Sequence, residues 1–172
     1  MPTRTEEIAS RMGAAKTVKA AVESPHGVFE KLTEEHREIA ALLMRVKATS
    51  DPEVRRALFP KVRTEMLAHD KGEVREVYPA FDQHPELQPM AKEHNVEATQ
   101  LERSLEQLSG VPPTDASWES LFDKLVELAV QHTREEEDEY FPAAERVLGR
   151  DEAERLQGRY EAAKAEVTGQ AS

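Results

Sequence analysis

The sequence has no cysteine, few aromatic residues and no long apolar run. The absence of cysteine excludes disulfides, thiolate-bound zinc and cysteine-ligated iron–sulfur clusters. No stretch approaches the roughly 20 apolar residues that a membrane-spanning helix needs, so we expect no membrane association. The first residues, MPTRTEEIAS, lack the apolar segment of a secretion signal, and we therefore expect a cytoplasmic protein.

Basic patches are missing as well. The 172 residues carry a net charge of −11, and no cluster of Lys and Arg offers a surface for phosphate groups. We therefore expect no nucleic-acid partner. The 38% of hydrophobic residues are enough for one compact core.

Apolar residues recur at helical spacing along most of the chain. Stripes with steps of three and four residues predict four helices, over about 28–48, 52–79, 87–108 and 115–148. Short connections rich in Pro, Gly and Ser separate them. Such a pattern is typical of an all-α fold, here an up-down-up-down antiparallel four-helix bundle.

The remaining residues extend the bundle at both ends. We expect an N-terminal helical arm in residues 1–27, whose helix over 1–23 is available for a protein partner or for self-association. The bundle occupies residues 28–148, and a short C-terminal helix and tail occupy 149–172. Within the second helix, Pro60 and Gly72 are expected to produce a kink or a looser turn, and Tyr78-Pro79 an end or bend.

Two segments are near copies of each other: HDKGEVREVYP over 69–79 and HTREEEDEYFP over 132–142. Each contains His-x-x-x-Glu, and positions i and i+4 lie one turn apart on the same face of a helix. The first and third helices also match around a Glu-His pair, so the chain resembles one helical hairpin used twice. The polar residues that this places on the four apolar stripes are His36, His69, Glu73, His94, His132 and Glu136.

These six residues predict a metal site. One histidine on an apolar stripe is usually a satisfied core residue, but six polar groups in one core need something that neutralises them. A pair of metal ions does so, with bridging carboxylates and terminal imidazoles. This donor set suits iron, zinc or manganese. Two metals with two bridging carboxylates favour iron, whereas zinc is not excluded.

The order His, His-x-x-x-Glu, His, His-x-x-x-Glu, followed by Glu-Tyr-Phe-Pro, resembles the hemerythrin-like (HHE cation-binding) domain over about residues 28–148. The resemblance implies a four-helix bundle around two iron ions, bridged by two carboxylates and an oxo or hydroxo group. The implied ligands are His36 and His69 on one iron, His94 and His132 on the other, and Glu73 and Glu136 as bridges.

The chain departs from the oxygen carriers of that family. Those carry a fifth histidine where this chain has Ala98, and an aspartate at the place of Glu137, although symmetry with the first copy favours Glu136 as the bridge. The missing histidine leaves an open position on the second iron. Ala40 and Ala98 are expected to leave room for a pocket near the metals, and Glu97 is the alternative occupant of the open position.

An open metal position favours reaction over reversible carriage. We therefore expect a di-iron oxidoreductase that acts on H₂O₂, O₂ or NO, either catalase-like or detoxifying. Two alternatives remain at this point. One is a sensor or carrier module for O₂, NO or iron, and the other is iron storage or sequestration.

Overall fold

The computed structural model describes residues 24–169, and all secondary structure in that range is helical. This confirms the prediction of an all-α protein. The predicted helix over 1–23 lies outside the described residues. Five helices of 18 to 22 residues dominate the described part. They are α2 (Val28–Lys47), α3 (Pro52–Gly72), α5 (Gln88–Ser109), α6 (Trp118–Glu135) and α8 (Arg150–Thr168).

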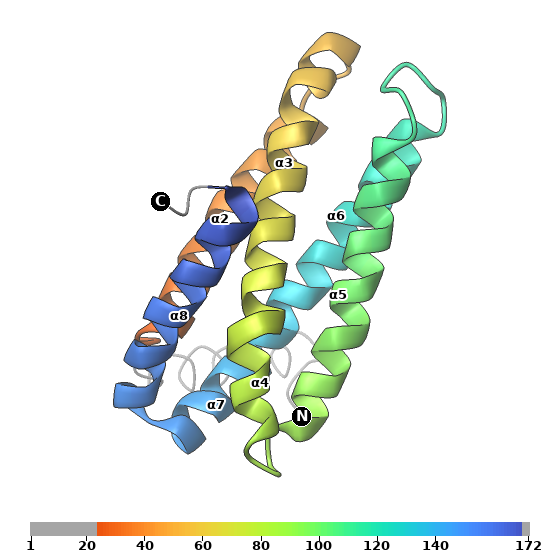
Figure 1. Ribbon diagram of the computed structural model, residues 1–172. Coiled ribbons are helices and arrows are strands. Elements are labelled where there is room, and N and C mark those ends of the chain that lie inside the picture. Colours follow the sequence, from red (N-terminus) through yellow and green to blue (C-terminus); the bar gives the residue numbers. More distant parts are fainter. Residues whose placement is uncertain (1–23, 170–172) are drawn as a thin grey trace, which may run out of the picture.

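Figure 1 shows α2, α3, α5 and α6 side by side, with the chain reversing direction between successive helices, and α8 against α2 and α3. Shorter helical segments extend α3 and α6 beyond their last residues. These segments are η1 (Glu73–Val77), α4 (Tyr78–Asp82), η2 (Glu136–Tyr140) and α7 (Phe141–Leu148). None of the helices between residues 24 and 169 is long and apolar enough to cross a membrane.

Local sequence explains where α3 begins and how far it runs. The side chain of Asp51 accepts a hydrogen bond from the backbone N–H of Glu53 at 2.9 Å, and Pro52 occupies the first turn, where its missing N–H costs nothing. The helical path continues through Pro60, and a looser turn of the expected kind follows Gly72 directly as the π segment η1.

The buried apolar side chains form two clusters, and the polar residues lie between them. Along α2, Leu32 belongs to one cluster and Ile39 to the other. Along α5, Ala91 and Leu101 are divided in the same way. His36 and His94 fall between these pairs, so the site occupies the middle of the bundle, with apolar packing at both ends.

The C-terminal helix that the sequence predicts after residue 148 is present as α8. α8 is 19 residues long, close to the length of the bundle helices. It buries Ala153, Leu156, Tyr160 and Ala163. At its N-terminal end it passes so close to Gly27 that a Cβ there would lie 2.4 Å from the carbonyl carbon of Ala153. α8 is therefore a structural part of the bundle.

Candidate metal centre

The structure brings the six predicted residues together in the middle of the bundle, and all six are buried. Each of the four bundle helices contributes. α2 supplies His36 and α5 supplies His94, whereas the two His-x-x-x-Glu pairs come from α3 with η1 and from α6 with η2.

Four of these side chains form the first buried group, which consists of His36, His69, Glu73 and Glu136. Their ligand atoms all lie within 4.8 Å of one another. The Nε2 atoms of His36 and His69 are 3.1 Å apart, and His36 Nε2 is 3.1 Å from Glu136 Oε2. His69 Nε2 lies 3.5 Å from Glu73 Oε2. Two imidazole nitrogens and two carboxylates thus face one point.

The second buried group consists of the half-buried Asp70 and the buried Glu73, His94 and His132, and its ligand atoms also lie within 4.8 Å of one another. His94 Nε2 is 3.3 Å from Glu73 Oε2 and 3.5 Å from Glu136 Oε1. Glu73 therefore serves both groups, as a bridging carboxylate would. The histidines are paired as the family resemblance implies, and Asp70 is an addition that the sequence interpretation missed.

Three carboxylates hold the outer nitrogens of the histidines. His36 Nδ1 lies 2.9 Å from Glu137, His69 Nδ1 lies 3.0 Å from Glu35, and His132 Nδ1 lies 2.8 Å from Glu97. When each Nδ1 donates its proton outward, the Nε2 lone pair is left facing the centre. This arrangement supports Glu136 rather than Glu137 as the inner carboxylate.

The structure places Glu97, the predicted alternative ligand, beside His132. Its carboxylate contacts the outer nitrogen of His132 and belongs to neither buried group. Because it lies three residues after His94 on α5, it points past the centre. Its place in the structure is that of a residue that orients His132.

Glu35 is buried and is not part of the solvent-exposed surface of α2. It is only 3% exposed and contacts Tyr160 as well as His69. The Tyr160 hydroxyl donates a hydrogen bond to Glu35 Oε2 at 2.5 Å, and Lys164 Nζ lies 3.1 Å from the same oxygen. Both Tyr160 and Lys164 come from α8. The C-terminal helix thus reaches the environment of His69.

Each His-x-x-x-Glu pair runs directly into a π turn. The backbone N–H of Tyr78 bonds to the carbonyl of Glu73, and that of Phe141 bonds to the carbonyl of Glu136. In both copies the next residue is proline, which has no N–H for an α-helical bond. The sequence predicts an end or bend at Tyr78-Pro79, but the helix widens by one residue and continues. π turns of this kind are frequent at functional sites.

The first π turn also places Tyr78 against the second buried group. Its ring stacks on the imidazole of His94 with the centroids 3.5 Å apart. Its hydroxyl donates a hydrogen bond to Glu136 Oε1 at 2.5 Å. Two members of the site are therefore held in place by one aromatic side chain.

The electrostatics differ among the four histidines of the site. Although burial opposes the charged form, Glu136 and Glu137 raise the pKa of His36 to about 9, and Glu136 and Glu97 raise the pKa of His132. Burial lowers the pKa of His94 to about 3, and burial together with His36 lowers the pKa of His69 to about 4. Although burial alone has the opposite effect, the neighbouring His132 and His36 hold the pKa of Glu136 well below its usual range. Metal ions bind neutral imidazole and ionised carboxylate, so His94, His69 and Glu136 are in the binding state, whereas a metal would displace protons from His36 and His132.

Several buried polar atoms lack a hydrogen-bond partner within residues 24–169. They include Asp70 Oδ1, Glu73 Oε1 and His132 Nε2. An unsatisfied buried polar group costs about 1–3 kcal/mol. A cation among these atoms would satisfy them, and the mixed nitrogen and oxygen donors suit a transition metal. The residues present therefore fit a bound metal.

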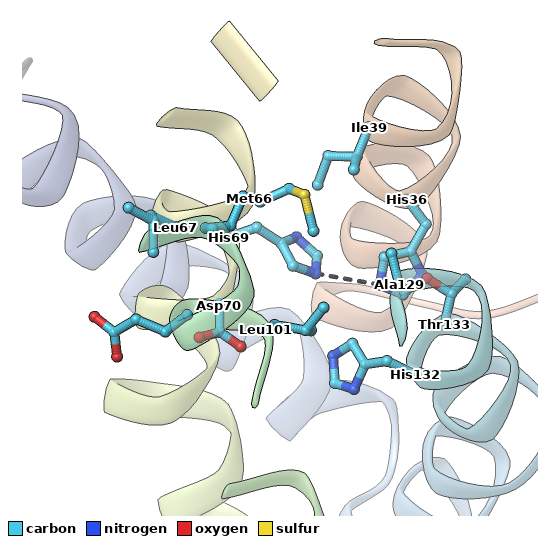
Figure 2. A pocket seen from close by; sticks show the side chains of 12 residues that line it. His36, Ile39, Met66, Leu67, His69, Asp70, Leu101, Ala129, His132 and Thr133 are labelled. Atoms are coloured by element: carbon cyan, nitrogen blue, oxygen red, sulfur yellow. Dashed lines mark hydrogen bonds between the residues drawn. The ribbon is translucent and has the colours of Figure 1, made fainter. Parts of the chain in front are cut away.

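A cavity of about 30 Å³ adjoins the site (Figure 2). A cavity needs about 10–15 Å³ to hold one water molecule, so this one has room for a molecule of the size of water or peroxide. Figure 2 shows the imidazoles of His36, His69 and His132 and the carboxylate of Asp70 at the cavity, together with the apolar side chains of Ile39, Met66 and Leu101. The lining residues include His36, His69, Asp70, His132, Ile39, Met66, Leu101 and Ala129.

The two alanines that were expected to line this space do not do so. Ala40 is exposed, because the cavity lies toward Ile39, three residues after His36, rather than toward the residue four positions on. Ala98 is buried but is not part of the cavity wall. Met66 and Leu101 are among the apolar residues that line the space instead.

Comparison with known proteins identifies the class of protein. The family profile of the hemerythrin HHE cation binding domain matches residues 27–144. The chain therefore belongs to this family, which confirms the resemblance found in the sequence. The buried groups and the family together indicate a metal-binding protein.

One curated relative is a DNA nickase from Nostoc sp., which is 22% identical over 136 residues. The matching region covers 77% of this chain and 38% of the nickase, so the chain corresponds to less than two fifths of that protein. No solved structure matches the chain.

Proposed function

We propose that this protein holds two iron ions in its two buried groups and reacts with H₂O₂, O₂ or NO. The observation that supports the proposal is the pair of His and carboxylate groups that share Glu73 beside a small cavity. When bound, iron would supply the redox chemistry that amino-acid side chains lack.

The chain's own residues have three tasks in this proposal. The buried histidines and carboxylates provide nitrogen and oxygen donors at fixed positions. Glu35, Glu97 and Glu137 set the orientation of three imidazoles through their Nδ1 atoms. The small cavity has room for molecules of a few atoms, such as O₂, NO and H₂O₂.

Elemental analysis of the purified protein, with a visible spectrum, tests the metal content. After expression in iron-replete medium we expect about two irons per chain and the near-ultraviolet absorption of a bridged di-iron centre. Zinc in place of iron, or protein that contains no metal, would contradict the proposal.

Turnover tests the reaction. With H₂O₂ added in large excess, we expect the evolution of many O₂ molecules per site, followed with an oxygen electrode. His132→Ala protein serves as the control for adventitious iron, because it lacks one proposed ligand. A stoichiometric and reversible spectral change without turnover would instead indicate the sensor or carrier alternative.

A further inference from the structure

Asp70 contributes a carboxylate to the wall of the cavity beside the site. Its Oδ1 atom is buried and has no hydrogen-bond partner within the described part of the chain. The ion pair of the neighbouring Lys71 is with Glu102, whose carboxylate lies 3.9 Å from Lys71 Nζ. A carboxylate oxygen without a hydrogen-bonding partner is costly to bury.

Helix geometry directs Asp70 to the second group. Consecutive residues of an α-helix point about 100° apart. His69 projects into the first group, and Asp70, the next residue, projects toward His94 and His132. Figure 2 shows Asp70 and His69 leaving α3 side by side at the cavity. The Asp70 carboxylate lies within 4.8 Å of the ligand atoms of the other three members of its group.

The second group also needs another donor. Ala98, one turn after His94 on α5, has no side-chain atom that can bind a metal. Glu97, the residue before it, uses its carboxylate on the outer nitrogen of His132. We propose that Asp70 is a direct ligand of the second metal and supplies from α3 the donor that α5 lacks.

This inference rests on the proposed function and adds a ligand to it. The matched control is Glu102→Gln. Glu102 also lines the cavity, but it is half-exposed and belongs to neither buried group. If any carboxylate near the cavity affected metal retention through its charge alone, Glu102→Gln and Asp70→Asn would behave alike.

The experiment compares wild type, Asp70→Ala, Asp70→Asn, Asp70→Glu and Glu102→Gln, all purified from iron-replete cells. Iron per chain is measured, and release to an excess of an iron chelator is followed over time. Far-ultraviolet circular dichroism reports folding. We expect about two irons in wild type and Glu102→Gln. In Asp70→Ala and Asp70→Asn we expect one iron to be lost, or to be released at least about 10-fold faster.

Asp70→Glu should restore part of the retention, because it keeps a carboxylate in reach. If Asp70→Ala fails to fold, the nearly isosteric Asp70→Asn carries the comparison. Wild-type iron content and wild-type release rates in folded Asp70→Asn would overturn the inference while leaving the proposed function intact. Fewer than two irons in wild type would instead overturn the proposed function.

Discussion

At the scale of single residues, the site consists of side chains that would each be costly to bury alone. His94 and Glu73 are fully buried, and neither contacts a Lys or Arg within residues 24–169. In that range, the carboxylates that contact His94 and the histidines that contact Glu73 all belong to the two buried groups. A bound cation is therefore expected to stabilise the folded state as well as to provide reactivity.

The ligand assignment predicts unequal effects of two His→Ala substitutions. His132→Ala should remove at least half of the bound metal, because it deletes one inward Nε2 atom from the second group. His84→Ala should leave the metal content unchanged, since His84 lies in the connection between α4 and α5. Elemental analysis of both variants checks this, and equal metal loading would contradict the assignment.

Tyr160→Phe tests the contribution of α8 to the site. The substitution removes the hydroxyl that donates to Glu35, which in turn holds His69 Nδ1. We expect metal affinity to fall by about 10–100-fold, as is typical when a residue behind a ligand is changed. The free energy of unfolding should fall by about 1 kcal/mol.

Tyr140→Phe is the matched control for Tyr160→Phe. Tyr140 is also buried, but its hydroxyl faces Glu93 and Glu135 rather than a histidine. Chelator competition and thermal unfolding of both variants measure the two effects. Equal affinity in wild type and Tyr160→Phe would show that the Glu35 contact does not affect the metal.

The sequence predicted the residues that repeat and missed those that do not. His69 with Glu73 and His132 with Glu136 are visible because the i and i+4 spacing occurs twice. Asp70 lies in the polar run His-Asp-Lys-Gly-Glu, where nothing distinguishes it from a solvated residue. Side chains from more than one face of a helix can reach a centre that four helices surround. The apolar periodicity of the sequence identifies only one face of each helix.

At the scale of elements, the contact between α3 and α8 depends on Gly72. A Cβ at this position would lie 2.6 Å from Tyr160 Cε2. At Gly158, within α8, a Cβ would meet no neighbouring atom within 4 Å, so this glycine provides the matched control. Both glycines lie within or at the end of α-helices, so the intrinsic gain from alanine, about 0.5–1 kcal/mol, is similar at the two positions.

We therefore expect Gly72→Ala to be less stable than Gly158→Ala by about 1–3 kcal/mol, the usual cost of overpacking. Denaturant unfolding of the two variants gives the difference directly. Gly158→Ala itself should be more stable than wild type. Equal stability of the two variants would mean that Tyr160 moves aside without cost.

The π turns are features of the helices that could not be predicted from the sequence alone. From the sequence, Tyr78-Pro79 is expected to be an end or bend, because proline breaks the α-helical hydrogen-bond pattern. The structure resolves this conflict with one wider turn that begins at Glu73, and it does the same at Glu136. Side chains on both sides remain buried, and this tertiary packing holds the helix together across the turn. Local propensity contains no such information.

At the scale of the whole molecule, α8 should be indispensable for folding. A chain that ends at Leu148 loses four buried side chains, among them Leu156 and Tyr160. Burying a large apolar side chain contributes about 1.5–3 kcal/mol, and a domain is stable by only about 5–15 kcal/mol. We expect the truncated chain to be largely unfolded by circular dichroism and to bind no iron. A folded, iron-loaded truncation would contradict this.

The relation to the Nostoc nickase gives the last prediction, which also concerns the molecule as a whole. Duplex DNA is densely negative, and proteins hold it through Lys and Arg that replace its counterions. With a net charge of −11, this chain should repel DNA at low salt rather than bind it. We expect supercoiled plasmid incubated with the protein, in the absence of peroxide, to remain supercoiled on an agarose gel.

The iron-depleted His132→Ala variant separates two causes of any cleavage that is observed. Nicking by wild type but not by this variant would trace cleavage to the bound metal. Nicking by both would show that the region shared with the nickase cleaves DNA without an intact centre. An intact plasmid with both proteins is the expected result.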